Sequence, residues 1–288
     1  MTASLRIAVL NDLHVGGRLG GGFQNPFLSD DPALTVAPTV ERIRAALPGL
    51  VLVPGDLTHN SFDAELAEVR ACLEGTGAPY IVCRGNHDCE TGAARTRFDA
   101  AFSGRERAQR PRLLDVDGAA GVAVLAVEAA WNSDDGLDAA RPPLAQQEDI
   151  GPALAVLDDL RPEWLFVLCH YPFMSQAEYP LSHGGPYAGH VEHGDELLEE
   201  LLARCGAVVV LVGHNHYHHV LAGERWLQIA TGAIIEYPSE WRLLTLADGC
   251  VTVEMCPGGV PAVEAAPPPP APWVSGRPQD RDFSWRPA

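Results

Sequence analysis

Positive charge is scarce in this sequence of 288 residues. It holds 20 basic residues against 38 acidic ones, which gives a formal net charge of -18 and an isoelectric point near 4.9. Proteins that bind nucleic acid regardless of sequence need a basic surface to neutralise the phosphate backbone. The shortage therefore argues against nucleic acid as a partner and leaves small substrates and local cation sites open.

Paired cysteines and long apolar stretches are lacking as well. The seven cysteines form an odd set without any CxxC pair, which is typical of reduced thiols and argues against a disulfide framework. No apolar run approaches the ~18 residues that a membrane span needs. The N-terminus also lacks the basic start and long apolar stretch of a secretory signal. We expect a soluble, cytoplasmic protein with no membrane partner.

Short apolar runs alternate with segments of helical period along the chain. The runs occupy residues 5–10, 50–53, 79–83, 122–127, 164–168 and 207–212. This alternation is typical of a sheet covered by helices. After residue 222, three further runs separated by turn residues predict antiparallel strands that finish a second sheet. With 47% hydrophobic residues, the chain can bury the core of one large domain, which we place at residues 1–264.

The C-terminal segment, residues 265–288, is rich in proline. That composition disfavours regular structure, so we expect an extended tail. Trp273, Phe283 and Trp285 leave an alternative open, in which the tail docks onto the body or onto a partner subunit. Assembly of the chain into a homo-oligomer is likewise left open.

Polar side chains follow five of the predicted strands, at the point where each strand ends. They are Asp12 and His14; Asp56; Asn86, His87 and Asp88; His170; and His214 and His216. Functional groups gather at the carboxyl ends of strands in open α/β sheets, so we expect these side chains to lie together. Alternation along an extended segment would also put Asp12 and His14, or His214 and His216, on one side of the chain.

Each of these elements has an ordinary structural reading when it is taken alone. A Gly-Asp pair is a common turn, and a single histidine beside a proline is more often a hydrogen-bonded core group than a ligand. It is improbable that metal-binding side chains follow five predicted strands by coincidence. Mixed oxygen and nitrogen donors without cysteine favour metals such as Mn, Fe or Zn over Ca. The sequence therefore predicts a metal site.

The motifs together resemble the five motifs of the calcineurin-like metallophosphoesterase superfamily. They are Asp12-x-His14, Gly55-Asp56, Gly85-Asn86-His87-Asp88, His170 and Gly213-His214-x-His216. The resemblance implies an α/β fold in which two mixed β-sheets form a sandwich flanked by helices. It implies one metal ion held by Asp12, His14, Asp56 and His216, and a second held by Asp56, Asn86, His170 and His214. It also implies that His87 contacts the substrate and assists the leaving group.

The residue types themselves suit the hydrolysis of a phosphoester. One carboxylate can bridge two cations, so Asp56 can link metals held ~3.5–4 Å apart. Two divalent ions against two carboxylates leave a local charge of about +2, which attracts an anionic phosphate. A hydroxide bridging the metals can attack phosphorus in line while His87 donates a proton to the departing oxygen. We expect two divalent or trivalent metal ions, Mn, Fe or Zn, as cofactors.

Three residues near the motifs are candidates for substrate contacts. Arg18 belongs to a glycine-rich loop that suits contact with a phosphate or a base, and that otherwise is a flexible surface loop. His59 stands where purple acid phosphatases carry a metal-binding tyrosine; we expect it to face solvent, with the metal pocket as the alternative. Asp88 either orients His87 or caps a turn.

Other histidines lie outside the motifs. His183 belongs to the segment 173–193, which we expect to form either a lid that contacts substrate or an oligomer contact. His218 and His219 follow the last motif, and we expect strand or surface positions for them, with a contact to the metal ligands as the alternative.

Within the superfamily, the GNHD and GHxH forms are most similar to bacterial cyclic-nucleotide phosphodiesterases and glycerophosphodiesterases. This similarity implies a small phosphodiester substrate. The GDxxDRG and GNHE patterns of the Ser/Thr protein phosphatases are missing, which argues against a phosphoprotein. A phosphomonoesterase acting on a small metabolite is the alternative. The acidic charge disfavours a nuclease, and retention of every ligand position together with His87 disfavours a non-catalytic scaffold.

Overall fold

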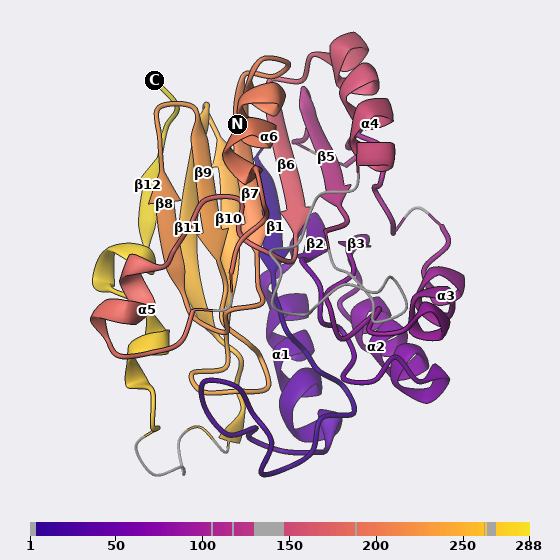
Figure 1. Cartoon of the computed structure of the whole chain (residues 1–288), viewed down its shortest axis with the longest axis vertical. Coiled ribbons are helices and arrows are strands. Elements are labelled where there is room, and N and C mark those ends of the chain that lie inside the picture. The colour runs from indigo at the N-terminus through magenta and orange to yellow at the C-terminus, as the bar shows by residue number, and fades with distance from the viewer. Residues whose placement is uncertain are drawn as a thin grey trace.

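Two mixed β-sheets packed face to face form the body of the protein (Figure 1). The computed structural model describes residues 4–104, 106–116, 118–129, 147–187, 189–261, 263 and 269–288. Over these residues the strand orders are β12-β11-β10-β1-β2-β3 in the first sheet and β4-β5-β6-β7-β9-β8 in the second. The predicted fold class, a sandwich of two mixed sheets flanked by helices, is confirmed.

The first sheet combines strands from both ends of the chain. Its members are β1 (Leu5–Val9), β2 (Leu50–Val53), β3 (Tyr80–Val82), β10 (Glu240–Ala247), β11 (Cys250–Pro257) and β12 (Phe283–Trp285). β1, β2 and β3 run parallel, whereas β10 pairs antiparallel with β1. The helices α1 (Pro32–Ala46), α2 (Asp63–Gly75) and α3 (Gly92–Ala101) supply apolar side chains to the core on its outer face.

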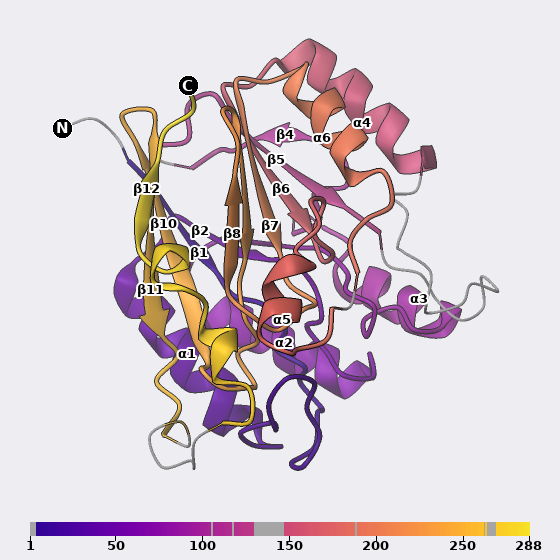
Figure 2. The same cartoon turned by 60° about the vertical axis from the view of Figure 1, so that its left-hand side comes forward.

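The second sheet is built from the middle of the chain. Its members are β4 (Arg112–Leu113), β5 (Val122–Val127), β6 (Trp164–Cys169), β7 (Ala207–Val212), β8 (His219–Ala222) and β9 (Trp226–Ala230). The helices α4 (Gln147–Leu160) and α6 (Gly194–Leu202) cover its outer face (Figure 2). A short helix, α5 (Glu178–Ser182), lies in the loop between β6 and α6.

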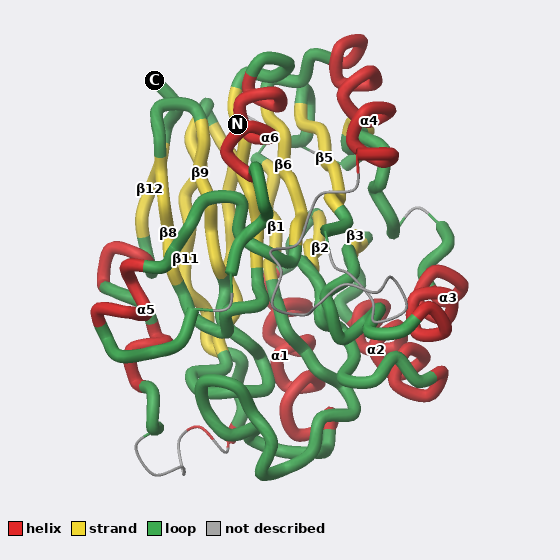
Figure 3. The backbone as a smooth tube through the Cα atoms, viewed as in Figure 1, coloured by secondary structure: helices red, strands yellow, loops and turns green. Residues whose placement is uncertain are grey.

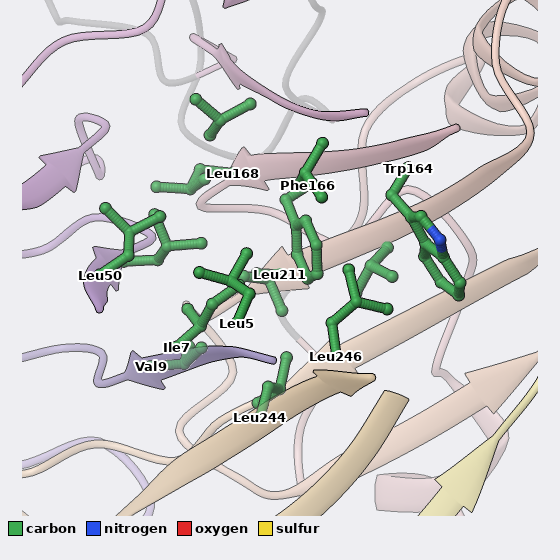
Figure 4. Close-up of a cluster of buried hydrophobic side chains, with 14 of the residues drawn as sticks. Leu5, Ile7, Val9, Leu50, Trp164, Phe166, Leu168, Leu211, Leu244 and Leu246 are labelled. Atoms are coloured by element: carbon green, nitrogen blue, oxygen red, sulfur yellow. The ribbon is translucent and has the colours of Figure 1, made fainter. Parts of the chain in front are cut away.

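The predicted strands are continuous apolar runs because most of them are buried on both faces. Phe166 and Leu168 of β6 point between the sheets, towards Ile7 and Val9 of β1 (Figure 4). The alternate residues, such as Val167, belong to the layer beneath α4 and α6. Period-two alternation thus supplies both layers from one strand.

The C-terminal segment is ordered over residues 269–288, so the expected extended tail is wrong there and the docking alternative is confirmed. Two 3-10 turns, η2 (Pro272–Ser275) and η3 (Pro278–Asp280), lead into β12, which pairs with β11. Trp285 packs edge-on against Trp164, with ring centroids 5.9 Å apart. Packing of aromatic rings buries apolar area and stabilises this segment, although its prolines have a low propensity for regular structure.

No helix within the described ranges is long and apolar enough to cross a membrane.

Candidate metal centre

The seven predicted metal ligands lie at the carboxyl ends of strands from both sheets. Asp12 and His14 follow β1, Asp56 follows β2, and Asn86 follows β3. His170 follows β6, while His214 and His216 follow β7. Asn11, which the sequence analysis passed over, ties the two sheets together here, because its side-chain amide donates to the Val212 carbonyl at 2.5 Å.

The first cluster joins ligands of the two sheets. The Nε2 atoms of His14 and His216 are 3.2 Å apart, and Asp12 Oδ1 lies 3.5 Å from His216 Nε2. Asp56 Oδ2 lies 3.6 Å from His14 Nε2. These four donors are the set that the resemblance implied for one metal.

The second cluster is equally compact. His170 Nε2 lies 3.2 Å from the same Asp56 oxygen, Oδ2, and 3.1 Å from Asn86 Oδ1. Asn86 Oδ1 is also 3.0 Å from His214 Nδ1. Asp56 therefore stands between the two clusters, as a bridging ligand must.

The donor set fits two cations. Among the residues that the structure describes, none gives the buried Asp12 Oδ2 a hydrogen bond, which is costly unless a positive ion faces it. Burial raises the pKa of Asp56, yet the nearby His170 and His87 outweigh burial and hold that pKa well below its usual value. Nitrogen and oxygen donors in such groups suit first-row divalent metals.

Polar contacts on the far side of two imidazoles fix their orientation. His170 Nδ1 donates to the Pro54 carbonyl at 2.9 Å, which leaves Nε2 free to face the cluster. His216 Nδ1 lies 3.0 Å from Glu236 Oε1. Carboxylate and carbonyl partners of this kind orient metal-binding histidines and raise their basicity.

Glu236 was missed by the sequence analysis. Its side chain is fully buried, and its carboxylate accepts the backbone N–H groups of Phe23 at 2.7 Å and Asn25 at 3.0 Å. The one available signal was an acidic residue within the apolar run "GAIIEY". A buried carboxylate needs partners, and here a metal-site histidine and the loop after β1 provide them.

The backbone at the ligands differs from the expected extended alternation, which is wrong for both pairs. Asp12 has φ 50°, His14 42°, Asp56 48°, His214 67° and His216 56°. These left-handed conformations are unfavourable for residues with side chains and occur where the surrounding structure enforces them. Left-handed residues that interrupt the extended backbone, and not a straight strand, bring each pair into the centre.

The glycines of the motifs make room for the ligands. A Cβ on Gly85 would lie 2.0 Å from Asp56 Oδ1, and one on Gly213 would lie 2.6 Å from Asp12 Oδ2. Only a residue without a side chain allows such approach. The Gly-Asn and Gly-His pairs are thus steric requirements of the site.

His87 and His59 line the metal centre together. The backbone N–H of His87 donates to Asp56 Oδ1 at 2.9 Å, and its Nδ1 lies 3.1 Å from the His59 carbonyl oxygen. The two rings stack with centroids 4.9 Å apart, and His59 Nδ1 lies 3.4 Å from His14 Nδ1. The expectation that His59 faces solvent is wrong. Burial, followed by the neighbouring His87, lowers the pKa of His59.

Asp88 is buried and holds together the loops that follow β2 and β3. Its carboxylate is fully buried and accepts hydrogen bonds from the N–H groups of Leu57, Thr58 and Gly85 and from the Thr58 hydroxyl, at 2.8–3.1 Å. Burial and the nearby Asp56 raise the pKa of Asp88 to about 6. The turn-capping alternative fits this geometry, and the predicted substrate contact does not.

Two further candidate substrate contacts, Arg18 and His183, lie on exposed parts of the chain. Arg18 is exposed in the loop between β1 and α1, and its role stays a prediction. His183 is exposed and stacks on Trp273 of the C-terminal segment, with centroids 5.9 Å apart. His218 and His219 are both buried, so neither has a surface position, and His219 begins β8, which confirms the expected strand position for that residue.

The C-terminal segment ties three loops near the centre to one another. The Asn25 side chain accepts from the N–H of Ala271 at 2.9 Å and donates to its carbonyl at 3.2 Å. The His218 N–H donates to the Val274 carbonyl at 2.8 Å. The Tyr179 hydroxyl donates to the Trp273 carbonyl at 3.0 Å. These bonds link the loop after β1, the β7–β8 connection and the α5 region.

Solved structures with the same fold have low sequence identity to this chain. A dimetal phosphatase from Danio rerio has a TM-score of 0.65 at 12% identity, covering 88% of this chain and 96% of its own. GAP50, described as the anchor in the inner membrane complex of Plasmodium, has a TM-score of 0.59 at 14% identity, covering 89% and 85%. Purple acid phosphatase PPD1 from yellow lupin has a TM-score of 0.57 at 16% identity, covering 90% of this chain and 52% of its own.

These identities show a shared fold and do not transfer an activity. No curated protein sequence gives a significant match to this chain. The sequence profile described as "Calcineurin-like phosphoesterase" matches residues 5–218, which include all seven ligand positions and His87. The chain belongs to the calcineurin-like phosphoesterase family.

Proposed function

We propose that this protein is a metal-dependent hydrolase of a small phosphodiester. The observation that carries the proposal is the pair of ligand clusters that share Asp56, with His87 beside them. Two bound divalent cations would supply an activated water and the positive charge that draws in a phosphate. The proposal goes beyond family membership in naming the ester class.

The residues of the chain have separate roles in this reaction. Asp56 joins the two clusters and, through Oδ1, accepts the backbone N–H of His87. That bond fixes the backbone at His87 beside the two ligand clusters, where its imidazole would be able to donate a proton to the departing oxygen. Pro54 and Glu236 hold two ligand imidazoles with Nε2 directed inwards, so little reorganisation is needed.

The charge of the surroundings favours a diester over a monoester. The chain contains no lysine, so all 20 basic residues are arginines. Within the described ranges, the side chains seen in contact with His14, His87 and His216 are histidines, carboxylates and phenylalanines. A dianionic monoester gains most from a guanidinium that binds the extra oxygens, whereas a diester carries one negative charge and two organic groups. The phenylalanine rings beside these histidines, Phe23 and Phe27, offer an apolar surface for the second organic group.

The test compares two esters of one alcohol. Metal-stripped protein is reloaded with manganese and assayed with bis(p-nitrophenyl) phosphate and with p-nitrophenyl phosphate. A higher kcat/KM for the diester is expected. A higher value for the monoester would overturn the diester assignment in favour of a phosphomonoesterase, and no turnover of either ester with two metals bound would argue for a scaffold. Asp56→Ala, prepared identically, controls for contaminating phosphatases.

A further inference from the structure

Phe23 is a half-exposed aromatic residue beside the polar metal centre. The side chain belongs to the loop between β1 and α1, which lies at the bottom of the molecule in Figure 3. It keeps 50% of its surface exposed. Its ring centroid is 4.7 Å from that of His216, 5.2 Å from that of His14 and 5.4 Å from that of His87. It therefore contacts two candidate ligands of the first cluster and the proposed proton donor.

The position of Phe23 is fixed by its backbone. Its N–H donates to Glu236, the buried carboxylate that also faces His216. Two residues later, Asn25 donates its N–H to the same carboxylate, and its side chain is held by Ala271. Residues of a flexible loop are seldom anchored at both a buried carboxylate and a distant backbone segment. The loop is organised to hold this ring at the metal centre.

Packing alone does not account for an aromatic residue at this position. Phe27, from the same loop, is buried and stacks against His14 at 5.9 Å, so it already closes the apolar contact beneath the ligands. Phe23 touches Phe27 edge-on at 5.9 Å and leaves its other surface open. The open surface of the ring is therefore available to an apolar group of a ligand bound at the metal centre.

We propose that Phe23 is a specificity-determining residue that contacts an aromatic group on the alcohol leaving the phosphodiester. This inference rests on the proposed function and deepens it by naming the chemistry of one ester arm. His87 is placed to protonate the leaving oxygen, and the Phe23 ring is in edge contact with the His87 ring. A planar apolar group on that oxygen meets Phe23, whereas the arm retained by phosphorus is directed away from His87 by the in-line geometry of displacement.

The kinetic test separates the leaving arm from the retained arm. Methyl p-nitrophenyl phosphate and bis(p-nitrophenyl) phosphate lose the same alcohol and differ in the group they retain. Phe23→Ala and Phe23→Leu are expected to lower kcat/KM for both esters by a similar factor of about 3- to 10-fold, the range of one aromatic contact. Phe23→Trp is expected to restore it. A decrease confined to the bis ester would place the contact on the retained arm and overturn the assignment, as would no decrease at all.

The matched control is Leu19→Ala in the same loop. Leu19 is an apolar residue of the same loop and is 65% exposed, against 50% for Phe23. Its replacement is expected to leave kcat/KM for both esters unchanged. A loss equal to that of Phe23→Ala would show that the loop tolerates no apolar truncation and would overturn a specific role for Phe23.

A binding measurement keeps this inference separate from the proposed activity. Titration calorimetry of the manganese-loaded protein compares phenylphosphonate with methylphosphonate, neither of which is hydrolysed. The protein is expected to bind phenylphosphonate more tightly, and Phe23→Ala is expected to abolish the difference. Equal binding of the two by the unaltered protein overturns the inference. Tighter binding of phenylphosphonate without turnover of any diester would refute the proposed phosphodiesterase activity. It would still support Phe23 as the residue that binds an aromatic ester group.

Discussion

Replacing Gly85 with alanine should dismantle the metal centre without removing any ligand. The added Cβ would lie 2.0 Å from Asp56 Oδ1 and 2.4 Å from the Asp56 backbone nitrogen. Carbon makes comfortable contacts at about 3.5 Å, so relief requires a shift of about 1.5 Å. The Asp56 backbone nitrogen must itself move by about 1.1 Å to reach that separation, and rotation of the Asp56 side chain cannot supply this movement. Metal–ligand distances tolerate about 0.2 Å.

Both metals should therefore be affected, since Asp56 lies in both clusters. The expected outcome for Gly85→Ala is fewer than two metals per chain by elemental analysis and a loss of about 1–3 kcal/mol in the free energy of unfolding, as is usual for overpacking. Gly151→Ala is the control, because among the described residues its added Cβ meets no atom within 4 Å apart from its chain neighbours and the backbone of its own helix, α4. That change should stabilise the helix by about 1 kcal/mol and leave the metals bound. Two metals of unchanged affinity in Gly85→Ala would refute the reasoning.

Three further changes probe individual roles. Asp56→Ala should lose both metals and all turnover, and two metals per chain by elemental analysis would contradict the bridging role. His87→Ala should keep both metals yet slow hydrolysis by about 10²- to 10⁴-fold, most for esters with poor leaving groups; equal slowing for every leaving group would count against proton donation. Glu236→Gln should weaken metal binding by about 10- to 100-fold because it removes the charged partner of His216. Calorimetric metal titration measures this change, with Glu240→Gln as a control that should bind metal normally.

The strands of both sheets could be predicted because burial on two faces leaves continuous apolar runs such as "VAVLAV" and "AVVVLV". The end of the chain could not be predicted in the same way. Its prolines cluster before residue 273, whereas Phe283 and Trp285 form a strand whose stability comes from pairing with β11 and packing on Trp164. Propensity over a short window does not register a partner that lies far along the chain.

The candidate ligands could be predicted because each lies within a few residues of the end of a strand and carries a side chain that can bind metals. Their partners could not. Glu236 is 211 residues from Asn25, and only the folded chain places the carboxylate against that N–H and against His216. His59 was misjudged for the same reason, since its half-buried position depends on the stacked ring of His87.

The sequence by itself determined the fold class and pointed to seven candidate ligands and a candidate proton donor, because these depend on residue type and on position near strand ends. The tertiary structure decided how these groups meet. Left-handed backbone at Asp12, His14, Asp56, His214 and His216 replaces the expected extended geometry, because contacts between the two sheets enforce conformations that local preference disfavours. The placement of Phe23 likewise exists only after Glu236 and Ala271 have anchored its loop, since no local pattern encodes partners more than 200 residues away.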